Sequence, residues 1–90
     1  MTCIWKYELP AGDYPRIRMQ RGAKILAVQT QDDRPQIWAL VHDFADTVVR
    51  QFAVYGTGHP VEYDRAQEYI GTVQMLNGAF VLHVFVEPEQ

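Results

Sequence analysis

The sequence predicts an all-β fold, a small antiparallel β-sandwich or barrel of about seven short strands in one domain spanning residues 1–90. Three observations predict it. Apolar and polar residues alternate with a period of two, turn-forming residues separate the alternating runs, and no segment keeps a helical period. A chain of this length has a thin core, so self-association would stabilise it.

The predicted strands, in chain order, are residues 3–9, 16–20, 24–31, 36–42, 48–55, 69–76 and 79–86. In the first, Cys3, Trp5 and Tyr7 share one face, as in a half-buried strand. In 24–31, strict alternation places Leu26 and Val28 on the same face.

Two runs carry further information about topology. The run 36–42 is apolar on both faces, which predicts a central strand or a face packed against another subunit. Asn77-Gly78 separates the last two runs. This dipeptide predicts a hairpin with a type I′ turn, because both central residues of that turn have positive φ.

Composition excludes several classes of protein. The net charge of -3 argues against broad nucleic-acid binding, which needs a basic surface. The single cysteine, Cys3, rules out an internal disulfide and a cysteine-based zinc site, and favours a reduced compartment. No apolar run has membrane-spanning length, and no signal peptide is recognisable. We therefore expect a cytoplasmic protein that does not bind membranes.

The loop after 48–55 is the strongest candidate site. Gly56 and Gly58 can both adopt positive φ, so successive N–H groups can form an anion-binding nest. Thr57 adds a hydroxyl and His59 a ring nitrogen. This set predicts a phosphate, ribose or carboxylate site. The alternative is a tight turn that His59 caps, since the third glycine and following helix of a dinucleotide fingerprint are missing.

Three residues outside the glycine pair complete the predicted ligand site. Arg50 lies on an apolar strand face, where a guanidinium needs a partner such as a carboxylate or a ligand anion. Tyr55 and Tyr63 flank the loop and are candidates for stacking on a base. The alternatives are a structural ion pair or an edge-strand position for Arg50 and an interface anchor for the tyrosines.

Catalysis and metal binding have little support in the sequence. Serine is absent, and Cys3 has no histidine near it in the chain. The three histidines, His42, His59 and His83, lack local metal-ligand spacing. We expect a non-enzyme without metal or cofactor; a small hydrolase using His59 or His83 is the remaining alternative.

Six motifs resemble a family of short phage- and prophage-encoded proteins of this length. They are Lys6-Tyr7-Glu8-Leu9-Pro10, Gly22-Ala23-Lys24-Ile25-Leu26, Trp38-Ala39-Leu40-Val41, Gly56-Thr57-Gly58-His59-Pro60, Tyr69-Ile70-Gly71-Thr72 and His83-Val84-Phe85. The resemblance implies an accessory protein of a mobile element that opposes host defence in the host cytoplasm. It implies no particular reaction.

Two functional hypotheses follow. The first is a homo-oligomer that sequesters a small anionic or nucleotide-like ligand at Gly56, Thr57, Gly58 and His59. The second is a protein–protein module, such as an inhibitor of a host defence protein or a minor phage structural component. Strands that are apolar on both faces and the acidic balance favour the second.

Overall fold

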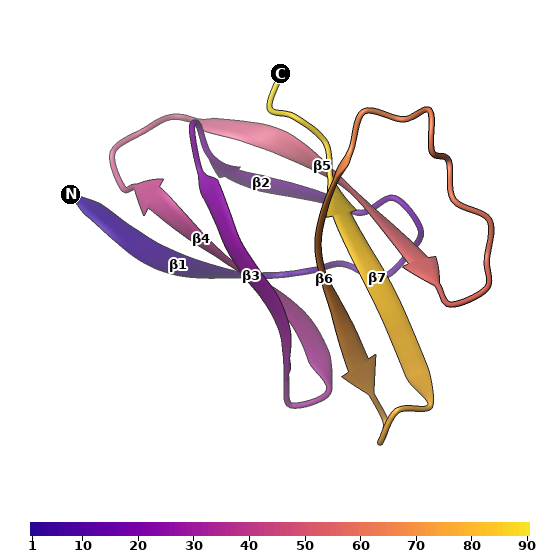
Figure 1. The fold of residues 1–90 in the computed structure, drawn as a ribbon. Helices are drawn as coiled ribbons and strands as arrows, with labels where there is room; N and C mark the ends of the chain where they lie inside the picture. Colours follow the sequence, from indigo (N-terminus) through magenta and orange to yellow (C-terminus); the bar gives the residue numbers. More distant parts are fainter.

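The computed structural model describes all 90 residues and contains seven strands and no helix (Figure 1). It has no helix that could cross a membrane. The predicted all-β fold is confirmed, and every predicted strand is present to within two residues at either end. The strands are β1 (Thr2–Glu8), β2 (Arg16–Gln20), β3 (Lys24–Gln31), β4 (Arg34–His42), β5 (Thr47–Gly56), β6 (Glu68–Met75) and β7 (Phe80–Val86).

The strands form two antiparallel sheets that pack as a sandwich. One has the order β1-β4-β3 and the other the order β2-β5-β7-β6. The run that is apolar on both faces forms β4, the centre of the first sheet, which is one of the two predicted alternatives. Its register with β1 is unbroken, from Thr2 opposite His42 to Glu8 opposite Gln36.

The core lies between the two sheets and comes from the alternating inward residues of both. Ile37, Ala39 and Val41 of β4 face Met19, Phe52 and Val84 of the second sheet, and all six are at most 2% exposed. Burial of these apolar side chains is the main stabilising contribution of such a small domain.

A β-bulge corrects the predicted face assignment in β3. The register shifts between Ile25 and Ala27, so Leu26 is an extra residue and is 45% exposed. Ile25 and Val28 therefore oppose Ala39 and Ile37 on the core side. The predicted pairing of Leu26 with Val28 on one face was wrong, because a bulge interrupts the period of two.

The two sheets approach most closely where β3 meets β6. A Cβ atom on Gly71 of β6 would lie 2.6 Å from Cγ1 of Val28. Only a residue without a side chain fits at this distance. Gly71 also directly follows the bulge in β6, where the register shifts between Tyr69 and Gly71.

Because of the directions in which the strands run, four connections between strands lie at the same end of the sandwich. These are the β1–β2 segment, the β3–β4 turn, the start of the β5–β6 loop and the β6–β7 turn, two of which lie at the lower edge of Figure 1. The β6–β7 turn confirms the expected positive φ at Asn77 (55°) and Gly78 (87°). Leu76 shares it, at 51°.

The β5–β6 loop, residues 57–67, has to return to the other end because β6 runs parallel to β5, two strands away. It is the long connection on the right of Figure 1. Only its first residues therefore remain at the end where the four connections meet.

Candidate functional site

A cavity of about 940 Å³ opens between the sheets at the end where the four connections meet. We call it the mouth cavity. Its walls are residues 8–13 before β2, Arg34 and Pro35, the end of β5 with the start of its loop, and part of the 75–82 hairpin. Gly56, Thr57 and His59 of the predicted loop line it.

The mouth cavity is mainly apolar with a few polar groups at its rim. Leu9 and Val54, 4% and 9% exposed, are its most buried residues, and Leu82 is half-buried. This combination of an apolar floor and a few polar groups is typical of small-molecule sites.

The charged groups of the lining are two carboxylates and one guanidinium. Nη1 of Arg34 lies 3.5 Å from Oε1 of Glu8, so these two charges offset each other. The carboxylate of Asp13 has no ion-pair partner within the chain. The lining is thus slightly acidic when His59 is neutral.

Residues Gly56 to His59, which we call the glycine loop, form a tight turn. The two glycines in it have different backbone conformations. The His59 amide donates to the carbonyl of Gly56 (3.1 Å), and Gly58 has a φ of 84°. Gly56 ends β5 opposite Leu82 and does not have positive φ. The anion-binding nest expected from two positive-φ glycines does not form, since Gly56 keeps the extended conformation of the strand.

Gly56 has a different reason to lack a side chain. A Cβ atom there would lie 2.9 Å from Nδ1 and 3.0 Å from Cε1 of His59. The imidazole ring thus packs directly on the Gly56 backbone at the wall of the mouth cavity.

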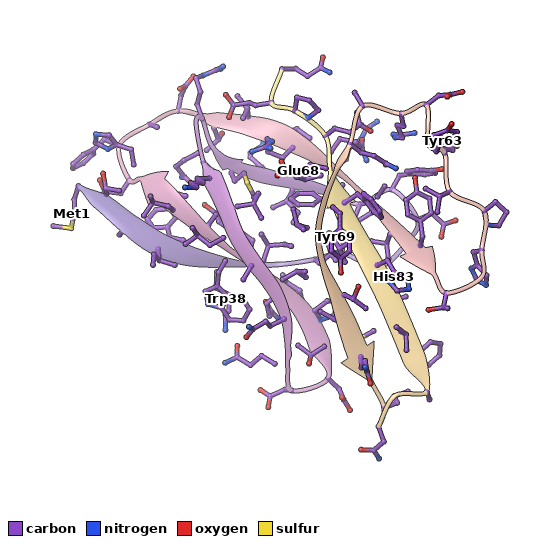
Figure 2. All side chains as sticks on the ribbon, in the orientation of Figure 1. Met1, Trp38, Tyr63, Glu68, Tyr69 and His83 are labelled. Atoms are coloured by element: carbon purple, nitrogen blue, oxygen red, sulfur yellow. The ribbon has the colours of Figure 1, made fainter.

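A chain of side-chain hydrogen bonds holds the loop to the second sheet. Thr57 Oγ1 lies 2.7 Å from Nε2 of His83, and Nδ1 of His83 lies 2.9 Å from Thr72 Oγ1. The Thr72 hydroxyl is 2.5 Å from that of Tyr69. Figure 2 shows Tyr69 on β6 and His83 on β7. Both ring nitrogens of His83 are therefore already hydrogen-bonded, in a structural role.

Arg50 lies far from the loop. It is six residues before Gly56 on β5, about 20 Å at the usual rise of a strand. Its side chain is 7% exposed and donates to the carbonyls of Ala23 and Glu87, both at 3.2 Å, while Nε has no partner. The guanidinium ties the β2–β3 turn and the carboxyl-terminal segment to β5 through carbonyls instead of a carboxylate or a ligand.

The two tyrosines of the predicted site separate in the fold. Tyr55 is 7% exposed, packs edge-to-face against Phe85 at 5.4 Å and donates to Gln67 Oε1 at 3.1 Å. Tyr63 is 87% exposed. Figure 2 shows it on the long loop. Neither lines the mouth cavity.

A smaller cavity of about 380 Å³ adjoins the first and shares Asp13, Val54 and His59 with it. Tyr55 lines this second cavity. The ring of His59 and the segment at Asp13 thus separate two neighbouring spaces.

An ion-pair cluster fixes the long loop beside the second cavity. The Tyr14 hydroxyl donates to Glu62 at 2.7 Å, and Arg65 pairs with Glu62 and Glu87 and stacks over the Tyr14 ring. The Tyr14 hydrogen bond, followed by that of Arg65, lowers the pKa of Glu62. The same contact with Glu62 raises the pKa of Tyr14.

A family model described as a domain of unknown function, DUF7352, matches residues 1–90. The chain belongs to the DUF7352 family. No curated protein and no solved structure matches it. The DUF7352 assignment covers every element described above, including all four connections around the mouth cavity.

Most of the lining of the mouth cavity in this DUF7352 chain was not predicted. Leu9 was expected only as a strand residue, and Arg34, Pro35 and Leu82 were not considered as site residues. Their meeting depends on the strand order, which local patterns do not contain. The turn residues 10–13, 32–35 and 77–78 could have indicated this meeting, because the loops of a sandwich cluster at its two ends.

The ionisable residues of the DUF7352 chain form no metal-binding arrangement. No group of three His, Cys, Asp or Glu side chains is close enough to hold an ion. Nδ1 of His42 lies 4.0 Å from Oδ1 of Asp43, next to the chain's amino terminus. His59 and His83 serve the glycine loop in the two ways described above.

Proposed function

We propose that the chain is a non-catalytic binding protein whose small ligand occupies the mouth cavity. The observation that carries the proposal is the position of Gly56, Thr57 and His59 on the wall of an apolar cavity between the two sheets. The loop start is held by the His83 hydrogen bonds and the packing of His59 on Gly56. A preformed site loses little entropy on binding.

The lining favours a neutral or cationic ligand with an apolar body. The one guanidinium, Arg34, is already opposite Glu8, whereas Asp13 is free to pair with a ligand amine. Burying an anion beside two carboxylates would be costly. An anionic or nucleotide-like ligand is the competing version. It would depend on displacing Glu8 from Arg34.

The biological role that we propose is sequestration of a small molecule in the cytoplasm of a host cell. Its support is the resemblance of the six sequence motifs to phage and prophage proteins. A sequestering protein requires only binding, which a rigid cavity on a small domain can supply. More specifically, we propose that sequestering this small molecule opposes a defence system of the host.

We propose a non-catalytic protein because few side chains near the cavities could act as a nucleophile or a general base. The chain contains no serine, and Cys3 lines neither of the two cavities described. His83 uses both ring nitrogens within the fold. His59 is the one histidine at the mouth cavity, so a hydrolase would have to depend on it. Turnover of a phosphodiester panel would contradict the proposal.

Calorimetry with three probes that share a naphthyl body tests the ligand chemistry. We expect naphthylmethylamine and naphthylmethanol to bind more tightly than naphthoate, because the lining is apolar and slightly acidic. His59→Ala should weaken binding, whereas Tyr63→Ala, on an 87% exposed residue outside the cavity, should not. Tightest binding by naphthoate supports the anion-binding version, and no binding by any probe contradicts the proposal.

A protein-interaction module is the second candidate, because the outer face of the first sheet carries four uncovered or half-covered apolar side chains beside Lys6 and Lys24. Ile4 of β1 is 59% exposed, Leu26 of β3 is 45% exposed, and Trp38 and Leu40 between them are half-buried. A contiguous apolar patch on a small domain marks an interaction surface. A stoichiometric partner whose binding survives His59→Ala but not Ile4→Lys would favour this candidate.

A further inference from the structure

We propose that β1 is a dimerisation edge, at which two copies of this chain pair antiparallel through Thr2–Glu8. The three-stranded sheets of the two copies then form one continuous sheet. The inference is independent of the proposed ligand, because Trp5, the residue at its centre, lines no part of the mouth cavity.

The outer side of β1 has no backbone partner. β1 pairs only with β4, and none of its residues makes a backbone hydrogen bond to a loop. Each of the other three edge strands is protected. β3 and β6 each carry a bulge and pack against each other, and β2 is only five residues long with exposed Arg16 and Arg18. β1 is seven residues long with neither a bulge nor a proline, and Lys6 is its one lysine.

Trp5 lies on the core side of β1 but is only partly covered by the rest of the chain. It lies opposite Ala39, which is fully buried, and on the same face as Cys3 and Tyr7, which pack against the core. Trp5 is nevertheless 40% exposed, because no strand lies beyond β1 to cover it. A large aromatic residue at the border of a core is a typical interface anchor.

The sequence of β1 selects one register of self-pairing. Because Trp5 is the central residue of Thr2–Glu8, pairing about Trp5 is the only register in which all positions of the strand overlap. It sets Trp5 against Trp5 of the second copy, Lys6 against Ile4, and Glu8 against Thr2. A register centred on Lys6 would set two lysines directly opposite each other, which is destabilising.

Native mass spectrometry tests the dimer directly. We expect the wild-type chain at twice its mass of 10.4 kDa and Trp5→Glu at the single mass, with an unchanged circular dichroism spectrum. Tyr63→Glu, a matched change on an exposed aromatic residue far from β1, should remain dimeric. A monomeric wild type, or a dimeric Trp5→Glu, overturns the proposal.

Disulfide formation tests the register while Trp5, the proposed anchor, stays in place. Facing residues of paired strands have Cα atoms about 4.5–5.5 Å apart, within the range that a disulfide spans. In a Cys3→Ala background, Ile4→Cys mixed with Lys6→Cys should oxidise to a covalent dimer, and neither variant should do so alone. Covalent dimers of Ile4→Cys or Lys6→Cys alone contradict this register.

Discussion

The His59 ring rests on the Gly56 backbone, with Nδ1 only 2.9 Å from the position that a Cβ atom on Gly56 would occupy. The ring that makes this contact also lines the mouth cavity, at the turn that follows β5. The contact explains why the strand ends in glycine at a position where φ is not positive.

Gly56→Ala should destabilise the protein by about 0.5–1.5 kcal/mol, the cost of turning the exposed His59 ring off its rotamer to admit the new methyl group. In a His59→Ala background the same change should cost much less, because the clashing ring is gone. Chemical denaturation of the four chains of this double-mutant cycle measures the coupling. Gly58→Ala provides a contrast: its cost, about 1 kcal/mol from positive φ, should not depend on His59. Equal costs of Gly56→Ala in both backgrounds would contradict the packing described.

Arg50 should matter for stability and not for ligand binding. Arg50→Ala leaves the carbonyls of Ala23 and Glu87 without their buried donor, so we expect a loss of about 1–3 kcal/mol. Arg18→Ala, on an exposed residue of β2, should stay within about 0.5 kcal/mol of the wild type. Calorimetry on the folded fraction of Arg50→Ala should give wild-type affinity for naphthylmethylamine. A selective loss of affinity would restore Arg50 to the ligand site.

The close approach of β3 and β6 predicts a second sensitive glycine. Gly71→Ala should lower the free energy of unfolding by about 1–3 kcal/mol, since the new methyl group would overlap Cγ1 of Val28. Val28→Ala should relieve part of that cost when the two changes are combined. If the two costs simply add in denaturation experiments, the sheets are free to move apart here.

Acid should loosen the long loop through Glu62. The pKa of Glu62 is lowered from 4.5, first by the hydrogen bond from the Tyr14 hydroxyl and then by that from Arg65. Both contacts therefore favour the ionised carboxylate in the folded protein. The stabilisation is complete above pH 4.5 and is lost as the pH falls through the lower folded-state pKa. Carboxyl NMR titration should show the Glu62 midpoint rising in Tyr14→Phe but not in Tyr63→Phe. An unchanged midpoint in Tyr14→Phe would remove Tyr14 as the main cause.

The strands could be predicted from the sequence because alternation is local. The bulge at Leu26 and the extra positive φ at Leu76 could not, since both depend on pairing partners. The loop with Gly56 and His59 lies at the mouth cavity, but the two positive-φ glycines expected there are not both present. Its two glycines serve different purposes, which only the packing of His59 reveals.

Arg50 illustrates the other limit of sequence reasoning. Its apolar neighbours on β5 correctly indicated a buried guanidinium in need of partners. The partners are carbonyls of Ala23 and Glu87, 27 and 37 residues away in the chain. No local pattern connects positions so far apart, because the strand order alone brings them together.

Amide chemical-shift mapping with naphthylmethylamine tests the central claim, that the mouth cavity is the ligand site. We predict shifts that saturate together at Leu9, Val54, Thr57, His59 and Leu82, with none at Trp5 or Tyr63. Shifts confined to β1, or the absence of any saturating shift at these cavity residues, would contradict it.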